Sequence, residues 1–235
     1  IVAGIDLARE AFRQVDPNLE FEAFVSDGDL IAAGDNIARV SGNARHIMSG
    51  ERVALNFMCH MSGIASYTRA FTTEVEGTGA KICCTRKTTP GLRAFEKYAV
   101  KCGGGINHRF GLYDMVMLKD NHNDYAGGIT GGVTRTKEYL NSKGKDIKIE
   151  VETRNLKEVQ EALDTGLVDR IMFDNFTPEL MVEGVKLVNG KCETEASGGI
   201  TGETIRSYAE TGVDYISVGA LTHSVRSLDL SLKEF

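Results

Sequence analysis

The stretch Thr85-Arg86-Lys87-Thr88-Thr89-Pro90-Gly91 decides the fold, because it joins a predicted strand to a predicted helix. Residues 80–84 before it form a short apolar run that is typical of a buried strand. Residues 92–100 after it place their apolar side chains on one helical face. Arg86 and Lys87 therefore stand at the C-terminal end of a strand, which is the edge where α/β sheets and barrels bind ligands.

The same alternation of strand and helix continues to the end of the chain. The expected strands span residues 80–85, 115–119, 147–152, 170–174, 192–196 and 215–218. The expected helices span residues 90–101, 130–142, 155–165, 177–188, 202–211 and 223–233. This pattern predicts a parallel sheet or a barrel that is incomplete relative to eight units, with an open doubly wound sheet as the alternative. Neither a GxGxxG nor a GxxxxGK[ST] fingerprint is present.

The first third of the chain has a different pattern. Residues 1–20 contain the end of a helix, and residues 21–25 and 37–40 form two short strands separated by tight turns. A long helix is expected over residues 44–71. We expect further N-terminal elements to precede Ile1 in the native protein.

These patterns divide the chain into three predicted parts. An N-terminal α/β domain covers residues 1–72, an α/β barrel covers residues 73–222, and a C-terminal helix covers residues 223–235 and packs back on the N-terminal domain.

Composition excludes several classes of protein. The 235 residues are 42% hydrophobic and 26% charged, as in ordinary globular proteins, and the net charge of −6 provides no basic field for nucleic acid or anionic membrane. No apolar run approaches the roughly 20 residues that cross a bilayer. The five cysteines show no CxxC pair, which disfavours a zinc site or a disulfide framework and favours the cytosol.

The residues that follow the predicted strands form an ordered series. Cations follow the first two strands, carboxylates (Glu152 and Asp174) the next two, and glycine-rich stretches the last two. Glycine loops before a helix suit a phosphate, carboxylates suit a divalent cation or ribose hydroxyls, and the cations suit a polyanion. The series predicts a ligand with a phosphate, sugar hydroxyls and further anionic groups, such as a phosphoribosyl donor that meets a carboxylated acceptor.

Long ordered runs across the whole chain resemble one family. The runs are Asn56-Phe57, Ser62 to Ala65, Gly77 to Lys81, Thr85 to Leu92, Glu96 to Val100, Gly103 to Gly105, Asn107 to Arg109, Gly111 to Asp114, Lys119 to His122, Asp174 to Phe176 and Ser197 to Ile200. They are similar to quinolinate phosphoribosyltransferases, also called carboxylating nicotinate-nucleotide pyrophosphorylases. The resemblance implies an N-terminal α/β sandwich domain, a C-terminal incomplete α/β barrel, a homodimer and the cofactor Mg²⁺.

The resemblance also implies a role for each site residue. Arg52, donated by the neighbouring subunit, would hold the quinolinate carboxylates together with Arg86, Arg109 and Lys119, with His108 nearby. Lys87, Glu152 and Asp174 would face the ribose, Mg²⁺ and pyrophosphate of phosphoribosyl pyrophosphate. The remaining predicted substrate contacts are Thr85, Ser197, Gly198, Gly199, Val218, Gly219 and Ala220. The predicted catalytic residues are Lys87, Lys119, Glu152 and Asp174, of which Glu152 and Asp174 would hold the metal, directly or through substrate or water.

The expected reaction transfers phosphoribose to quinolinate and releases CO₂, giving nicotinate mononucleotide. Four other readings stay open at this point. A ModD-type paralogue or a nicotinate-specific transferase would share the barrel and the phosphate loops. A phosphosugar-binding protein would keep the fold without the reaction. A barrel aldolase would use Lys119 as a Schiff-base nucleophile.

Overall fold

The structure is a computed structural model that describes residues 1–234. Its contacts divide the chain into two compact units. The first unit comprises residues Ile1–Thr72, Lys87–Ile106 and Gly219–Phe235, and the second comprises Thr73–Arg86 and Asn107–Val218. Across the described residues, none of the helices combines the length and the hydropathy that a membrane span requires.

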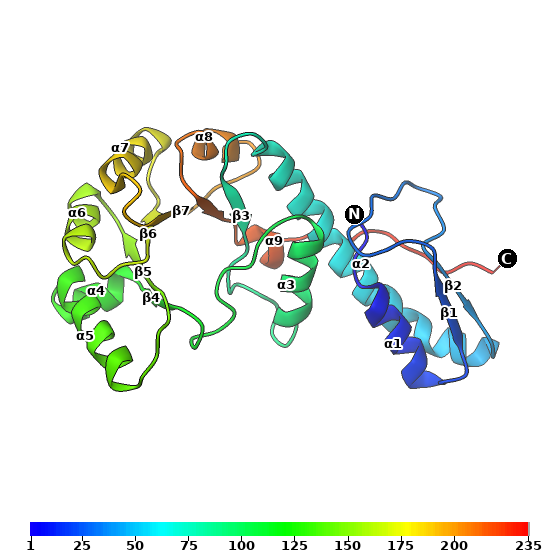
Figure 1. Cartoon of the computed structure of the whole chain (residues 1–235). Helices are drawn as coiled ribbons and strands as arrows, with labels where there is room; N and C mark the ends of the chain where they lie inside the picture. The colour runs from blue at the N-terminus through cyan, green and yellow to red at the C-terminus, as the bar shows by residue number, and fades with distance from the viewer. Residues whose placement is uncertain (235) are drawn as a thin grey trace. The chain divides into compact units, whose positions relative to one another are not determined.

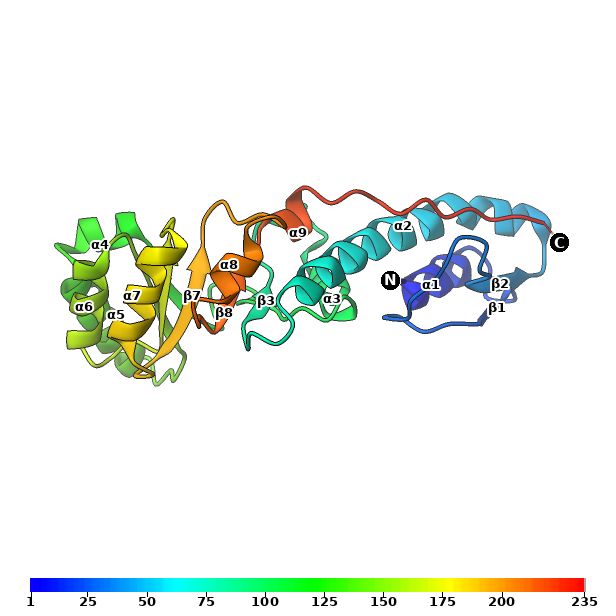
Figure 2. The same ribbon diagram turned by 90° about the horizontal axis from the view of Figure 1, so that it is seen from above.

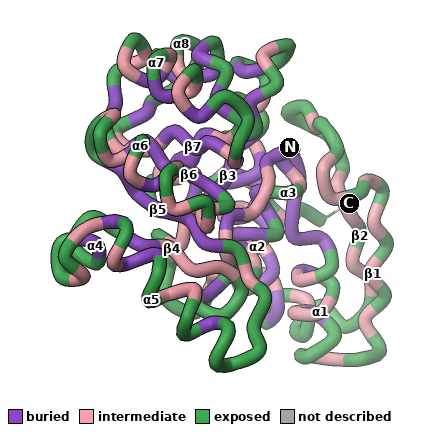
Figure 3. The backbone as a smooth tube through the Cα atoms, turned by 60° about the vertical axis from the view of Figure 1, so that its left-hand side comes forward, coloured by how far each residue is buried: buried purple, intermediate pink, exposed green. Residues whose placement is uncertain are grey.

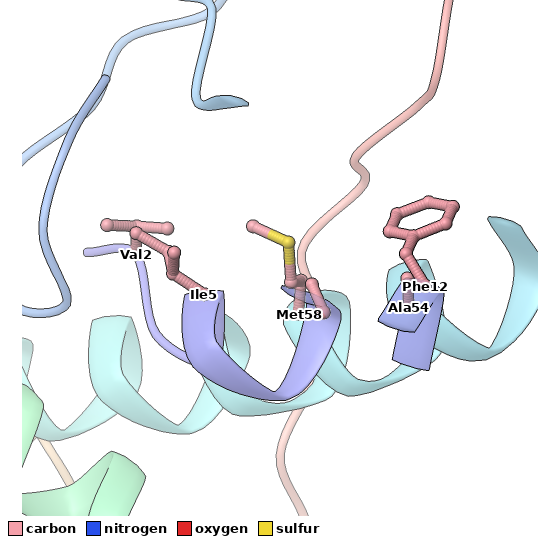
Figure 4. Close-up of a cluster of buried hydrophobic side chains, with 6 residues drawn as sticks. Val2, Ile5, Phe12, Ala54 and Met58 are labelled. Carbon is pink, nitrogen blue, oxygen red and sulfur yellow. The ribbon is translucent and has the colours of Figure 1, made fainter. Parts of the chain in front are cut away.

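In the first unit, a small antiparallel sheet accompanies two helices (Figure 1). The order is α1 (Ile5–Val15), β1 (Glu20–Ala23), β2 (Ala38–Ser41) and α2 (Ala44–Glu74). The two helices pack together because each presents an apolar stripe to the other. Figure 4 shows Ile5 and Phe12 of α1 beside Ala54 and Met58 of α2, all of them buried.

The first unit also holds α3 (Arg93–Cys102), α9 (Ala220–His223) and the C-terminal segment. The predicted helix over residues 223–235 is wrong, because residues 224–234 are not helical and Phe235 lies outside the described residues. The segment runs along α2 (Figure 2), where Leu228 N donates to Cys59 O at 2.9 Å. A Cβ atom at Gly63 of α2 would overlap the backbone of Arg226, so the glycine permits this close packing.

The second unit is built on a six-stranded parallel sheet. Its strands are β3 (Lys81–Cys83), β4 (Val116–Leu118), β5 (Ile149–Thr153), β6 (Arg170–Asp174), β7 (Glu193–Ser197) and β8 (Tyr215–Ser217). Their spatial order is β3-β8-β7-β6-β5-β4. The last strand therefore pairs with the first, as in a barrel, while β3 and β4 form the two edges. This order confirms the predicted incomplete α/β barrel.

Five helices of this unit lie along the outer side of the sheet (Figure 1). They are α4 (Asp120–Ala126), α5 (Ile129–Ser142), α6 (Leu156–Asp164), α7 (Pro178–Val188) and α8 (Ile205–Ala209). The central strands are buried along most of their length (Figure 3). Burial on both faces is typical of parallel sheets covered by crossover helices.

Two aspartates fix the strand register at the N-terminal edge of this sheet. Asp169, which precedes β6, accepts from Ile149 N at 2.7 Å, and Asp214, which precedes β8, accepts from Thr194 N at 2.8 Å. Each carboxylate therefore links the start of its own strand to a neighbouring strand.

Candidate functional site

The strands of the second unit carry charged residues on one face. In β5, Ile149 and Val151 alternate with Glu150 and Glu152, and successive side chains of a strand point to opposite faces. The apolar set suits the face covered by the helices, so the two glutamates face the interior of the open barrel. The same alternation places Asp174 of β6 at the C-terminal end of this interior, where it pairs in register with Ser197.

Glu152 and Lys119 form an ion pair at that end. Lys119 Nζ lies 3.3 Å from Glu152 Oε2, and the lysine side chain is half exposed. Burial raises the pKa of Glu152, and the negative charge of Asp174 raises it further, while Lys119 acts in the opposite direction. The two carboxylates therefore lie close enough for their charges to repel each other.

Helix α4, which the sequence did not predict, holds both partners of this ion pair. His122 Nδ1 accepts from Lys119 N at 3.1 Å, and Asn123 Nδ2 donates to Glu152 O at 3.4 Å. Asn123 is buried, so its amide is a structural link rather than a surface contact. The helix was missed because Asp120–Ala126 has no apolar periodicity.

Arg86 and Arg109 form a second charged group in the same unit. Burial lowers the pKa of Arg109, and the charge of Arg86 lowers it further. Arg109 Nη1 reaches only Met115 O, at 3.4 Å, and Arg86 Nε is buried without a hydrogen-bond partner among the described residues. Two neighbouring guanidinium groups in this state suit an anion, and their planar forks match carboxylates.

A glycine loop closes the ends of β6 and β7. Asn175 has the left-handed φ of 56°, and its N–H donates to Ser197 O at 2.9 Å. Gly198 has a φ of 102°, and a Cβ atom there would overlap Asn175 Oδ1. Gly199 also has a positive φ, of 61°, but a Cβ atom there would have no neighbour within 4 Å. Side-chain-free backbone of this kind can bring N–H groups close to a phosphate.

We define the buried ionic layer as His108, Glu150, Arg170 and Glu195. Within the strands, Glu150 lies two residues before Glu152 in β5, and Glu195 lies two residues before Ser197 in β7. His108 Nε2 lies 2.9 Å from Glu150 Oε2 and 3.3 Å from Glu195 Oε2. Arg170 Nη1 donates to Glu195 Oε2 at 2.8 Å. Burial lowers the pKa of His108, but the two carboxylates outweigh burial and raise it to about 9.

The electrostatics of the two layer glutamates differ. Burial and the charge of Glu195 raise the pKa of Glu150, whereas His108 and Arg170 overcome burial and lower the pKa of Glu195. His108, Glu150 and Glu195 together offer ligand atoms within 4.8 Å of one another, which is a donor set for a divalent metal. Because Arg170 already supplies a positive charge there, we assign no metal to the layer.

Sequence reasoning found His108 but missed Glu150, Arg170 and Glu195. Their signal was available, since Glu150 lies two residues before Glu152 and Glu195 lies two residues before Ser197. Period-two alternation places each pair on one face. The alternation therefore predicts that polar residues in the middle of these strands share the interior face with those at the strand ends.

The remaining predicted site residues divide between the units. The second unit contains Thr85, Arg86, His108, Arg109, Lys119, Glu152, Asp174, Ser197, Gly198, Gly199 and Val218, and the first contains Arg52, Lys87, Gly219 and Ala220. Within the first unit, Thr222 Oγ1 donates to Lys87 O at 2.8 Å, and a Cβ atom at Gly219 would lie 3.1 Å from Lys87 Cδ. Arg52 is exposed on α2. Which substrate groups these residues bind stays a prediction.

A cavity of about 630 Å³ also lies in the first unit, but its chemistry differs. Phe12, Phe21 and Met58 line it together with the C-terminal segment. Its lining also carries three carboxylates, of Asp35, Glu51 and Asp229, against two cations, Arg39 and Lys233, which does not favour a ligand with several negative charges, so we do not place the functional site there.

Comparison with known proteins decides the family. Residues 1–62 match the family "Quinolinate phosphoribosyl transferase, N-terminal domain", and residues 64–233 match "Quinolinate phosphoribosyl transferase, C-terminal domain". The chain belongs to the quinolinate phosphoribosyltransferase family. The expected resemblance is therefore confirmed over nearly the whole chain.

Individual members of the quinolinate phosphoribosyltransferase family agree. The chain is 48% identical to a tobacco "Quinolinate phosphoribosyltransferase [decarboxylating] 2b, mitochondrial", over 99% of this chain and 70% of that protein. It is 45% identical to a "Probable nicotinate-nucleotide pyrophosphorylase [carboxylating]" of Bacillus subtilis, over 99% of this chain and 79% of that protein.

Solved structures of the family share the fold. The structure of NadC from Streptococcus pyogenes matches with a TM-score of 0.95 and 40% identity, over 100% of this chain and 81% of that one. The nicotinate-nucleotide pyrophosphorylase from Francisella tularensis matches with a TM-score of 0.94 and 40% identity, over 98% of this chain and 81% of that one.

Proposed function

We propose that this protein transfers phosphoribose from phosphoribosyl pyrophosphate to quinolinate and releases pyrophosphate and CO₂, giving nicotinate mononucleotide. The observation that carries the proposal is the pair of guanidinium groups, Arg86 and Arg109, in the unit that also holds Glu152 and Asp174. Two cations suit an acceptor with two carboxylates, and two carboxylates suit a metal-bound sugar diphosphate. Membership of the family supports this reading.

The acceptor and the donor call on different residues. Arg86, Arg109 and Lys119 hold the acceptor carboxylates, with His108 beside them and Arg52 contributed by a partner subunit. Lys87, Glu152 and Asp174 act on the ribose and pyrophosphate. The 5′-phosphate is held by the glycine loops, with backbone N–H groups and small side chains at Ser197, Gly198, Gly199, Val218, Gly219 and Ala220, and Thr85 is a further substrate contact.

The residues at the strand ends fit Mg²⁺. The mutual repulsion of Glu152 and Asp174 is relieved by a shared cation, and Mg²⁺ prefers carboxylate and phosphate oxygens. When bound, the ion neutralises charge on the leaving pyrophosphate. We propose that these two side chains hold it directly, through water or through the substrate.

The protein groups mainly orient the reactants and balance charge. The pyridine nitrogen attacks the anomeric carbon as the C–O bond to pyrophosphate breaks, and Lys87 balances charge on the leaving group. Glu152 and Asp174 stabilise the positive charge that develops on the sugar. The pyridinium then accepts the electron pair of the breaking C–C bond as CO₂ departs, and the ring carbon takes up a proton.

The test is incubation of the protein with phosphoribosyl pyrophosphate, Mg²⁺ and either quinolinate or nicotinate. We expect product from quinolinate, and a lower kcat/KM for nicotinate, because loss of one carboxylate leaves a cation unpaired at a cost of roughly 2–5 kcal/mol. Equal kcat/KM for the two acids, or use of nicotinate alone, would contradict the proposal in favour of a nicotinate-specific transferase.

We further propose that the protein is a homodimer in which Arg52 completes the partner's site. In a two-fold dimer, a heterodimer of Arg52→Ala and Lys119→Ala subunits has one site with both lesions and one with neither. Each variant alone is expected to be nearly inactive. Refolding the two together should restore about a quarter of wild-type activity in a random 1:1 mixture. No recovery, with heterodimers shown to form, would place Arg52 outside the partner's site.

We propose a cytosolic location, which the cysteine usage of the sequence supports. Fractionation of source cells with an antibody to the protein tests it.

A further inference from the structure

The carboxylate of Glu150 has one close partner in the described part of the chain. Its side chain is fully buried in β5, and Oε2 lies 2.9 Å from His108 Nε2. Neither Glu150 oxygen has a hydrogen-bond partner among the described residues, so its contact with His108 is an ion pair. Glu195, in contrast, also pairs with Arg170. A buried carboxylate is costly to desolvate, and this one is compensated chiefly by the ring of His108.

The same ring contacts the backbone of Arg109 on its other side. Arg109 N lies 2.7 Å from His108 Nδ1 and donates to it when the ring is neutral. The two carboxylates favour the imidazolium, whereas this backbone N–H favours a neutral ring with its proton on Nε2. In both states Nε2 carries a proton and faces the carboxylates at ion-pair distance, without the alignment of a hydrogen bond. The ring thus links Glu150 to the peptide that begins Arg109.

The guanidinium of Arg109 depends on that link, because its own contacts are weak. Nη1 lies 3.4 Å from Met115 O, and Nη2 lies 3.5 Å from Met117 Sδ. Neither acceptor is charged, and a carbonyl at 3.4 Å is near the limit of hydrogen bonding. The charges of Glu150 and Asp114 also act on the guanidinium, so the direction of the side chain depends on these charges and on where its backbone is held.

We propose that Glu150 is a positioning residue, which orients His108 and through it aims Arg109 at the acceptor carboxylates. The inference rests on the proposed function, in which Arg109 holds the acceptor. Glu150 therefore affects acceptor binding rather than the chemical step, although its own position is inside β5 and not at the strand end.

The main test replaces Glu150 by a side chain without an acceptor and by one that keeps an acceptor. In Glu150→Met we expect the KM for quinolinate to rise at least about tenfold while kcat changes less than about threefold. Glu150→Gln retains an oxygen for His108 Nε2–H and should keep the KM within about threefold of wild type. Equal KM values for the two variants, or a loss confined to kcat, would overturn the proposal.

Two comparisons separate positioning from a general loss of structure. Glu193→Met removes a carboxylate that pairs with Arg170 and Lys148 but lies outside the contacts of His108, so both constants should stay within about twofold of wild type. In a His108→Gln background, the Glu150→Met substitution should no longer raise the KM, because the residue through which it acts is gone. A KM effect that persists undiminished in that background would assign Glu150 a purely structural role.

Nitrogen-15 NMR of the wild-type His108 ring tests the geometry without any activity. We expect Nε2 to carry a proton, and an unprotonated Nε2 would overturn the proposal even if the Glu150→Met variant fails to fold. If the wild-type protein transfers no phosphoribose to quinolinate, the proposed function fails, while an unprotonated Nε2 would separately overturn the link between Glu150 and the ring.

Discussion

Two layers of charge lie on the same strands, two residues apart, and they differ in how the charges are balanced. In the buried ionic layer, Glu150 and Glu195 meet His108 and Arg170, and all four residues are at most 8% exposed. At the strand ends, Glu152 meets a half-exposed lysine, and the nearby guanidinium groups have no carboxylate partner in the hydrogen bonds of the described residues. In the lower layer, opposite charges face one another within the protein, whereas the exposed position of Lys119 and the lack of a carboxylate hydrogen-bonded to the guanidinium groups leave the upper residues suited to a ligand.

The largest expected effect separates Glu152 from the layer below it. Glu152→Gln should lower kcat by roughly 10²–10³, because it removes charge that stabilises the transition state, while quinolinate affinity changes little. Asp174→Asn serves as the parallel variant. Steady-state kinetics with both substrates measures the split. A normal kcat with a defect only in quinolinate binding would contradict the assignment.

The Glu152→Gln variant should be no less stable than wild type at neutral pH. The folded-state pKa of Glu152 is raised, so ionisation of this carboxyl costs stability once the pH exceeds its ordinary value of 4.5. The cost is absent below that pH, grows until the folded-state pKa is passed, and is removed by glutamine. Urea unfolding of Glu152→Gln and wild type at pH 4 and pH 7 measures this, and a variant that is less stable only at pH 7 would contradict the sign.

A smaller effect is expected in the glycine loop above the upper layer. Gly198→Ala should lower the free energy of unfolding by roughly 1–3 kcal/mol, since it strains a φ of 102° and overlaps Asn175. Gly199→Ala is the matched control, because its φ is 61° and the space around it is open. Denaturant unfolding compares the two. Equal losses would show that backbone strain alone, and not the contact with Asn175, fixes the loop.

The smallest effect concerns Lys87, a proposed catalytic residue of the first unit. Thr222→Val removes the hydroxyl that donates to Lys87 O and should reduce kcat/KM for phosphoribosyl pyrophosphate about fivefold, as for loss of a hydrogen bond worth about 1 kcal/mol. Thr211→Val removes a comparable hydroxyl contact to Tyr208 O at 2.7 Å and should leave kcat/KM unchanged. An equal loss in both variants would remove the specific link to Lys87.

Sequence patterns predicted the strands and most helices because their apolar residues keep a regular period. β6 was expected at residues 170–174, where the structure has Arg170–Asp174. The helix predicted for the C-terminal segment is wrong. Local propensity allowed a helix there, but Leu228, Leu230 and Leu232 alternate, as in an extended chain. Contacts with α2, which no local pattern contains, decide its conformation.

The positions of Lys119, Glu152 and Asp174 at strand ends were predictable from the sequence, while their roles stay predictions. Of the buried ionic layer only His108 was predicted; period-two alternation could have placed Glu150 and Glu195 on the interior face, but their partners become known only when the strand order is known. His108 meets Glu150 and Glu195 across 42 and 87 residues of sequence. Such distant pairs follow from the strand order, which an element list alone does not fix.

The two aspartates at the opposite edge of the sheet have a consequence for how this protein can change. A slip of one residue would turn Glu150 and Glu152 away from the interior, since side chains alternate. Asp169 and Asp214 oppose such slips from the side remote from the ligand. Loops at the ligand side can therefore acquire insertions and new side chains without altering the alignment of the strands, so mutation can explore new acceptors while the scaffold keeps its geometry.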